Sequence, residues 1–115
     1  MKRRVLLVLV FALVLCISVS AASTAYVANP SLSFVGATAY CSVVCMGAST
    51  TDYISATLTL YQGSTVIGSW SGSGYFRVPV SGNCNVTSGV SYDLELTWSV
   101  NGSQQPGITV TNTCQ

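Results

Sequence analysis

The chain has 115 residues and very little charge, with four basic side chains, three acidic ones and no histidine, which gives a formal net charge of +1. Without histidine, the chain has no Ser-His-Asp or Cys-His catalysis, no histidine metal site and no histidine pH switch. The composition therefore favours a binding or structural role, and we expect neither enzymatic activity nor a cofactor or metal.

The N-terminus has the layout of a secretory signal. Lys2, Arg3 and Arg4 precede an uncharged apolar run over residues 5–17, and small residues follow over 18–25. This order predicts a signal peptide over residues 1–25, a mature domain over 26–115 and a secreted or extracellular location. The alternative is an uncleaved anchor, since the apolar stretch falls just short of the roughly 20 residues that span a bilayer. A membrane is an expected partner only in that case.

Loss of the first 25 residues leaves Arg77 as the only basic side chain, against Asp52, Asp93 and Glu95. The mature charge is then 1 − 3 = −2. Nucleic-acid binding needs several Lys and Arg on one surface, so nucleic acid is excluded as a partner.

The mature chain keeps four cysteines, Cys41, Cys45, Cys84 and Cys114. An even number in a small exported domain predicts disulfides, and their spacing lacks the paired C-x2-C knuckles of a zinc site. Cys84 with Cys114 is the favoured pair, because both lie at one end of the strands that we expect to pair. Cys41 and Cys45 would be about 13 Å apart on a straight strand, too far for a bond, so the rest of the connectivity stays open.

Short runs of Val, Ile, Thr, Tyr and Leu alternate with Gly, Ser and Asn clusters, and no segment of the mature chain has a helical period. This pattern predicts an all-β fold, a seven-stranded β-sandwich. The expected strands cover residues 31–35, 37–45, 53–61, 65–70, 75–80, 90–100 and 108–113.

Turns are expected at residues 71–74 and 81–83 and, most clearly, at Asn101-Gly102, a typical hairpin pair. Alternation within the strands predicts the core. The expected inward residues are Ile54, Ala56, Leu58, Leu60, Phe76, Val78, Val80, Tyr92, Leu94, Leu96, Trp98, Ile108 and Val110.

Residues 89–94, Gly-Val-Ser-Tyr-Asp-Leu, resemble the tyrosine corner of immunoglobulin-like sandwiches. The resemblance implies that Tyr92 begins strand F and bonds back to the chain that leads into it. The chain departs from antibody-type domains at Leu94, where a cysteine would stand, and over residues 53–61, where the tryptophan of strand C is missing.

Most of residues 31–114 is also similar to an uncharacterised family of small exported bacterial proteins, a domain of unknown function. The shared features are Gly36-Ala37, "ISATLTLYQG" at residues 54–63, Ser69-Trp70, and the G-x-x-Y of Gly89 and Tyr92. The resemblance implies export and an immunoglobulin-like β-sandwich, and it supplies no catalytic residues.

Two sets of side chains are candidates for function. Asp93 and Glu95 leave the same face of one strand about 6–7 Å apart, a spacing near that of a glycosidase pair, but solubilising surface charge is the preferred interpretation. Asp52 is expected to cap a loop. An aromatic strip for sugar or protein binding is the second candidate, against the alternative of ordinary cross-strand pairs. Its residues are Tyr40, Tyr53, Tyr61, Trp70 and Tyr75.

The expected function is that of a secreted, non-catalytic module that binds an extracellular protein or glycan. The alternatives are a membrane-anchored or self-assembling component of the cell surface and, third, a small hydrolase built around Asp93 and Glu95.

Overall fold

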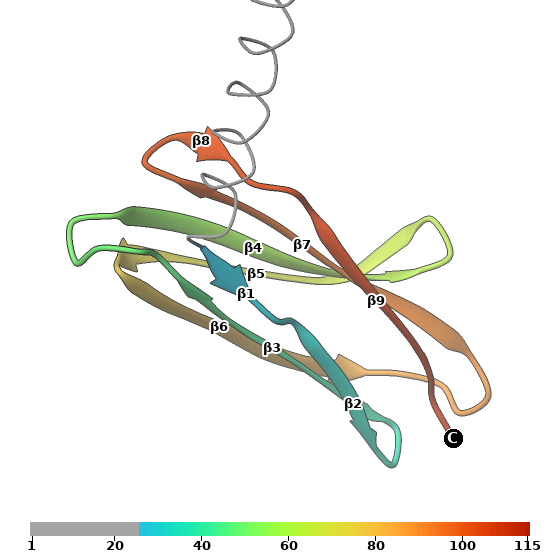
Figure 1. Ribbon diagram of the computed structural model, residues 1–115. Helices are drawn as coiled ribbons and strands as arrows, with labels where there is room; N and C mark the ends of the chain where they lie inside the picture. The colour runs from blue at the N-terminus through green and yellow to red at the C-terminus, as the bar shows by residue number, and fades with distance from the viewer. Residues whose placement is uncertain (1–25) are drawn as a thin grey trace, which may run out of the picture.

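A computed structural model describes residues 26–115, which form nine strands in two antiparallel sheets packed as a sandwich (Figure 1). The expected signal peptide lies outside the described residues. Within residues 26–115, no helix is long and apolar enough to cross a membrane. The strands are β1 (Val27–Ala28), β2 (Ser31–Val35), β3 (Thr38–Met46), β4 (Tyr53–Gln62), β5 (Thr65–Tyr75), β6 (Arg77–Asn85), β7 (Ser91–Val100), β8 (Ser103–Gln104) and β9 (Ile108–Thr113).

The two sheets are built around different central strands. In the four-stranded sheet, β3 pairs with β6 on one side and with β1 and β2 on the other. In the five-stranded sheet the order is β5-β4-β7, and both β8 and β9 pair with β7. The chain crosses between the sheets after β3, after β5 and after β6, so each sheet contains strands from both halves of the domain.

The core lies between the inner faces of the sheets and is filled by every second residue of the central strands. Side chains alternate across a strand, so a strand with one face on the core buries one set and exposes the other. This confirms the expected inward positions of β4 and β7, all of which are at most 5% exposed. They are Ile54, Ala56, Leu58, Leu60, Tyr92, Leu94, Leu96 and Trp98, and Val100 continues the same buried face.

The all-β sandwich is confirmed, but two predicted turns are wrong. β5 runs on through residues 71–74 and β6 through residues 81–83, and β1 and β8 are two short additional strands. The Gly and Ser residues that indicated turns stand in regular strand pairing, for example Gly72 opposite Ala56 and Gly82 opposite Cys41. None of the glycines in these two segments has a positive φ.

These glycines allow the two sheets to approach closely along the β5 and β6 edges. A Cβ atom added at Gly72 would lie 3.3 Å from a methyl carbon of Val80. At Gly82 it would lie 2.2 Å from the indole nitrogen of Trp70, so the Trp70 ring occupies the space that a side chain at Gly82 would need. These positions require glycine because the two sheets pack closely there. In the local sequence such a glycine looks the same as a turn residue.

Phe76 forms the corner between β5 and β6, which corrects its expected place on the apolar face of a strand. Its φ is 67°, a left-handed conformation that a bulky residue rarely adopts. The Phe76 backbone N–H donates to the Asp52 carbonyl oxygen at 2.8 Å, and the Phe76 carbonyl oxygen accepts from the Gly47 N–H at 2.7 Å. These two bonds to the β3–β4 loop hold the corner in place.

The turn at Asn101-Gly102 is confirmed, with φ of 52° and 82° at the two residues, as a hairpin of this type requires. At the other end of β7, the hydroxyl oxygen of Tyr92 accepts a hydrogen bond from the backbone N–H of Thr87 at 2.8 Å. The Tyr92 ring also packs on Phe34 with centroids 5.9 Å apart. This end of the sandwich is thereby tied to the chain that enters β7.

Substitution of Gly82 by alanine tests the packing of Trp70. We expect Gly82→Ala to lower the free energy of unfolding by about 1–3 kcal/mol, because the new methyl group overlaps the indole ring. Gly74→Ala is the matched control, since its Cβ would meet only Val78 at 3.6 Å, an ordinary contact. Urea unfolding followed by Trp fluorescence measures both. Equal stability of the two variants would contradict the packing described.

Candidate functional site

The outer face of the five-stranded sheet is a broad surface of short polar side chains. Cross-strand partners on this face match hydroxyl with hydroxyl, as in the row of Ser73, Ser55 and Ser99 and the row of Ser71, Thr57 and Thr97. Such rows place hydrogen-bonding groups about 5 Å apart across the strands and about 7 Å apart along them. The face therefore offers many donors and acceptors in a regular array.

Two exposed aromatic rings lie at one end of this array. Tyr53 of β4 and Tyr75 of β5 are direct cross-strand partners, and their ring centroids are 5.1 Å apart in an edge-to-face arrangement. Their side chains remain 42% and 66% exposed. Pairs of this geometry are favourable in themselves, so the rings are held in place without being buried.

A shallow depression of about 190 Å³ lies on the same sheet, next along β4 from the aromatic pair. Ser55, which lines it, is two residues from Tyr53 on the same face, a separation of about 6–7 Å. The depression is almost entirely polar. Its lining residues are Ser55, Thr57, Thr97, Trp98, Ser99 and Gln104.

Asp52 and Asn101 fix the backbone on which Tyr53 stands. The Asn101 side chain donates to a carboxylate oxygen of Asp52 at 2.9 Å, and its amide oxygen accepts from the Tyr53 N–H, also at 2.9 Å. The Asn101 N–H donates to the Tyr53 carbonyl oxygen at 2.7 Å. Since the Asp52 carbonyl also holds Phe76, the residue after Tyr75, one network positions both strands of the aromatic pair.

Asp52 is only 9% exposed, and its carboxylate is satisfied by hydrogen bonds within its loop. It accepts backbone hydrogen bonds from Ala48 at 2.9 Å and Ser49 at 3.0 Å, which confirms the expected capping role. The hydrogen bonds from Asn101 and then Ser49 lower the pKa of Asp52, against a smaller opposing effect of burial. The charged carboxylate is thus the form that the folded structure stabilises.

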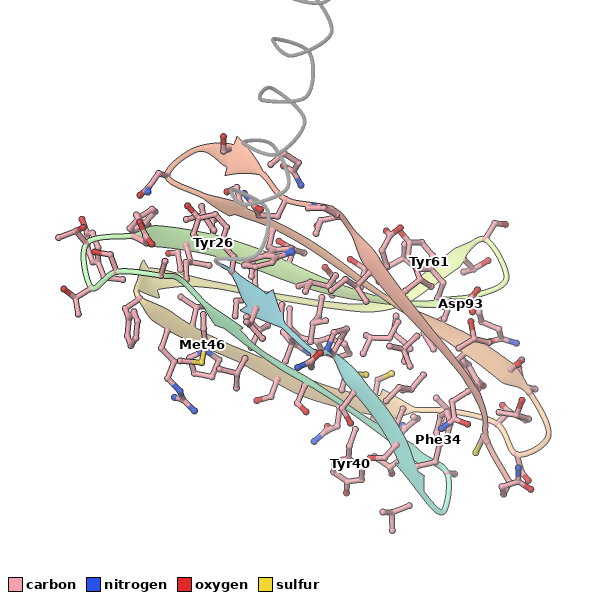
Figure 2. The ribbon with its side chains drawn as sticks, viewed as in Figure 1. Tyr26, Phe34, Tyr40, Met46, Tyr61 and Asp93 are labelled. Carbon is pink, nitrogen blue, oxygen red and sulfur yellow. The ribbon has the colours of Figure 1, made fainter. Side chains whose placement is uncertain are left out.

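The expected aromatic strip is not continuous. Tyr61 stands at the other end of β4, where its hydroxyl donates to Glu95 at 3.4 Å. Trp70 is opposite the buried Leu58 and points toward the core, so its assignment to the outer face is wrong. Tyr40 is exposed on the outer face of the other sheet. Figure 2 labels Tyr40 and Tyr61 and shows them on different sheets. Only Tyr53 and Tyr75 come together.

Asp93 and Glu95 share the outer face of β7, and each carboxylate accepts a hydrogen bond from a neighbouring strand. Asp93 accepts from the Thr111 hydroxyl at 2.6 Å, and Glu95 accepts from Tyr61. Neither lines the depression at Ser55. These two carboxylates therefore take part in cross-strand contacts of the sheet surface.

The four cysteines of the described chain are free thiols, and all lie at least partly inside the sandwich. Cys41 and Cys45 are on the same buried face of β3, four residues apart on a strand whose pairing with β6 is unbroken. Burial raises the pKa of both to about 11, and for Cys41 the nearby thiol of Cys84 adds to the effect. Burial also raises the pKa of Cys84.

A second depression, of about 280 Å³, lies where the edges of β2 and β9 approach each other. Ser33, Phe34 and Asn112 are among its lining residues. The Asn112 side chain bridges the two sheets there by donating to the Leu32 carbonyl oxygen at 3.1 Å. This depression lies at the boundary between the two sheets, and no cluster of charged side chains lines it.

A scan of the chain against protein-family models finds no match, and a search of curated proteins finds none either. The all-β, two-sheet part of the expected resemblance is confirmed by the structure, while no family is identified. Within residues 26–115, no group of three or more His, Cys, Asp or Glu side chains is arranged to hold a metal ion. The exposed rings of Tyr53 and Tyr75 can stack on another ring, and the Ser and Thr side chains beside them can exchange hydrogen bonds with hydroxyl groups.

Sequence reasoning missed the hydrogen-bond network of Asp52 and Asn101, which are 49 residues apart along the chain. The sequence indicates only the local role of each residue, Asp52 in a loop and Asn101 in a hairpin. The signal that connects them is the pairing of β4 with β7, which places the first residue of β4 beside the end of β7.

Acid should weaken the network, because the lowered pKa of Asp52 means that folding favours the carboxylate. Its contribution is complete at neutral pH, above the ordinary Asp pKa of about 4, and is lost as the pH falls through the lower folded value. We therefore expect Asp52→Asn to lower the Tm at pH 7 and the difference from the unsubstituted chain to shrink toward pH 2. Thermal unfolding monitored by circular dichroism measures this.

Asp93→Asn is the control for the pH series, since it removes an equal charge from the outer face of the same sheet, at the end of β7 away from Asn101. A Tm difference for Asp52→Asn that stays constant from pH 7 to pH 2 would contradict the assigned role of the carboxylate.

Proposed function

We propose that this chain is a secreted, non-catalytic protein with an immunoglobulin-like sandwich that binds a neutral glycan on the outer face of its five-stranded sheet. The observation that carries the proposal is the exposed Tyr53–Tyr75 pair beside a depression lined with hydroxyl groups. Secretion rests on the signal-like N-terminus, and the absence of histidine from the whole chain favours binding over catalysis.

The strand order supports the immunoglobulin-like assignment. In immunoglobulin nomenclature, β2, β3 and β6 correspond to strands A, B and E of one sheet. The strands β5, β4, β7 and β9 correspond to C′, C, F and G of the other sheet. With this assignment the sheet neighbours follow the immunoglobulin pattern, with C′ beside C and no strand D beside E. The bond from the Thr87 N–H to the Tyr92 hydroxyl, five residues apart at the start of F, is the one expected of a tyrosine corner.

A sugar suits the chemistry of this face better than an apolar partner does. A pyranose ring has C–H bonds that pack on an aromatic ring and hydroxyls that exchange hydrogen bonds with Ser and Thr. The tyrosine rings supply large amphipathic contact area at low entropic cost, and the Asp52–Asn101 network holds their strands before binding.

Charge points to a neutral sugar. The outer face of the same sheet carries Asp93 and Glu95, while Arg77, the only basic residue after Arg4, is on β6 of the other sheet. Sulfated or uronic-acid glycans would meet carboxylates with no cation to offset them. We therefore expect selectivity for uncharged oligosaccharides.

Glycan binding is tested on an array of neutral and anionic oligosaccharides, followed by calorimetry with the best ligand. We expect neutral glycans to bind and the Tyr53→Ala, Tyr75→Ala double variant to lose at least about tenfold in affinity, equal to about 1.4 kcal/mol. Tyr40→Ala, which removes an exposed tyrosine from the other sheet, should leave the affinity unchanged. Failure of every glycan to bind, or equal loss in Tyr40→Ala, would overturn the proposal.

Self-assembly is the second candidate, and the edge strand β5 is the observation that favours it. β5 has 11 residues, pairs only with β4 among the described strands, and contains no charge and no proline. Val66 near its start is 53% exposed. The facing edge strand β6, by contrast, carries Arg77 and Pro79. Unprotected edges of this kind can pair with a second copy of the same strand.

A lysine on the edge strand tests self-assembly. If copies pair through β5, sedimentation velocity should show association that rises with concentration, and Ser71→Lys should abolish it by placing like charges together. Thr97→Lys adds the same charge to the exposed face of the central strand β7 and should leave association intact. A monomer at every concentration would rule out this candidate without affecting the glycan proposal.

A further inference from the structure

We propose that Cys41 of β3 and Cys84 of β6 form a disulfide that clips the two strands together, while Cys45 and Cys114 remain thiols. The proposal rests on the pairing of these strands and does not depend on the glycan-binding function. It assigns Cys84 a partner other than Cys114, which the sequence alone favoured.

The pairing register brings the two side chains together on the inner face. Cys41 is opposite Gly82. Cys84, the next inward residue of β6 after Gly82, is opposite Ala39, the inward residue of β3 before Cys41. The two cysteines are therefore diagonal neighbours on the same face of adjacent antiparallel strands. Diagonal Cα atoms are about 7–8 Å apart with the Cβ atoms closer, so a shift of about 1 Å reaches the upper part of the disulfide range.

The residues directly opposite the cysteines place no bulky side chain of β3 or β6 between them. Gly82 has no side chain and Ala39 has only a methyl group, and the Trp70 ring packs over Gly82 from β5. Cys84 is also the last inward residue of β6, one position before the strand ends at Asn85. A strand end moves more easily than a strand centre, which makes the small shift of Cys84 feasible.

Cys45 lies beyond disulfide reach of Cys41, and the Cys114 thiol is engaged in a hydrogen bond at the turn between β2 and β3. Cys45 is opposite Val78, near the other end of the β3–β6 pairing, and is fully buried four residues from Cys41. Four residues on a regular strand span about 13 Å, twice the reach of a disulfide. The thiol of Cys114 is also fully buried, and it donates to the Gly36 carbonyl oxygen at 3.5 Å in the turn between β2 and β3.

Closure of the bond proceeds by thiol–disulfide exchange with a small oxidised disulfide such as oxidised glutathione. Cys84, which is partly exposed, loses its proton and attacks one sulfur of the reagent, giving a mixed disulfide and one released thiolate. The Cys41 thiolate then attacks the Cys84 sulfur and expels the second reagent thiolate. The two protein thiols are oxidised by two electrons, the reagent is reduced to two thiols, and the two protons pass to them.

The raised pKa values set the pH dependence of closure. In the reduced protein burial, and next the neighbouring Cys84, raise the pKa of Cys41 to about 11. Burial, the larger cause, persists once Cys84 is in the mixed disulfide, so the Cys41 thiolate is scarce at neutral pH. Closure should therefore accelerate about tenfold per pH unit between pH 7 and pH 9, where the attacking thiolate fraction rises in proportion.

A single tryptic cut separates the two cysteines, since Arg77 is the only Lys or Arg after Arg4. The full chain, in a Cys16→Ser background, is equilibrated with reduced and oxidised glutathione, alkylated, and digested with trypsin without reductant. A Cys41–Cys84 bond keeps the fragment ending at Arg77 joined to residues 78–115, whereas a Cys84–Cys114 bond leaves the fragments separate. Mass spectrometry identifies the linked cysteines directly.

We expect linked fragments in the starting chain and in Cys45→Ala and Cys114→Ala, and separate fragments in Cys41→Ala and Cys84→Ala. Reduction of the linked protein should lower its Tm by more than about 10 °C. Fragments that separate without reductant overturn the proposal, as does a linkage through Cys45 or Cys114. Because peptide mapping of the starting chain decides the pairing, the result does not depend on the variants folding.

Discussion

The burial of every second residue along β4 and β7 is the constraint on which the rest of the domain depends. These strands form the centre of the larger sheet, and their inward leucines at Leu58, Leu60, Leu94 and Leu96 have no exposed surface. Each such side chain contributes roughly 1.5–3 kcal/mol when removed from water. The same two-residue period sends the intervening Ser, Thr and Tyr residues outward. The polar face that we propose as a binding surface is therefore a direct consequence of the way the core is filled.

Much of this architecture can be predicted from the sequence, because alternation is a local property of each strand. The strands over residues 53–62 and 91–100, their inward residues and the Asn101-Gly102 hairpin all follow from the order of apolar and polar residues. Local order fails where contact between distant strands decides the structure. The local sequence predicts turns at Gly72 and Gly82, yet both residues stand in strands where the opposite sheet or the Trp70 ring takes up the space of a side chain.

The candidate site likewise combines features that local alternation predicts with features that depend on strand pairing. The outward direction of Tyr53 follows from the alternation of residues along β4. Its contact with Tyr75 depends on the pairing of β4 with β5, which the sequence does not specify. That pairing contains a shift at Ile67, since Leu60 is opposite Gly68 and Tyr61 is opposite Val66. The extra residue changes the face on which the preceding side chains lie. The face of Trp70 and the pairing of the cysteines both depend on the register between neighbouring strands. The local sequence therefore predicts the face of Trp70 wrongly and leaves more than one cysteine pairing open.

The corner at Phe76 has a consequence for how the domain tolerates changes in chain length. The crossovers after β3 and after β6 each contain several residues, whereas Phe76 alone joins β5 of one sheet to β6 of the other. Tyr75 and Arg77, on either side of it, are exposed on opposite sheets. An insertion or deletion of one residue there would reverse the faces of β6, turning Val78 and Val80 out to water and Arg77 and Pro79 into the core. Variation in length among natural or engineered versions of this domain should therefore accumulate in the longer crossovers and spare this joint.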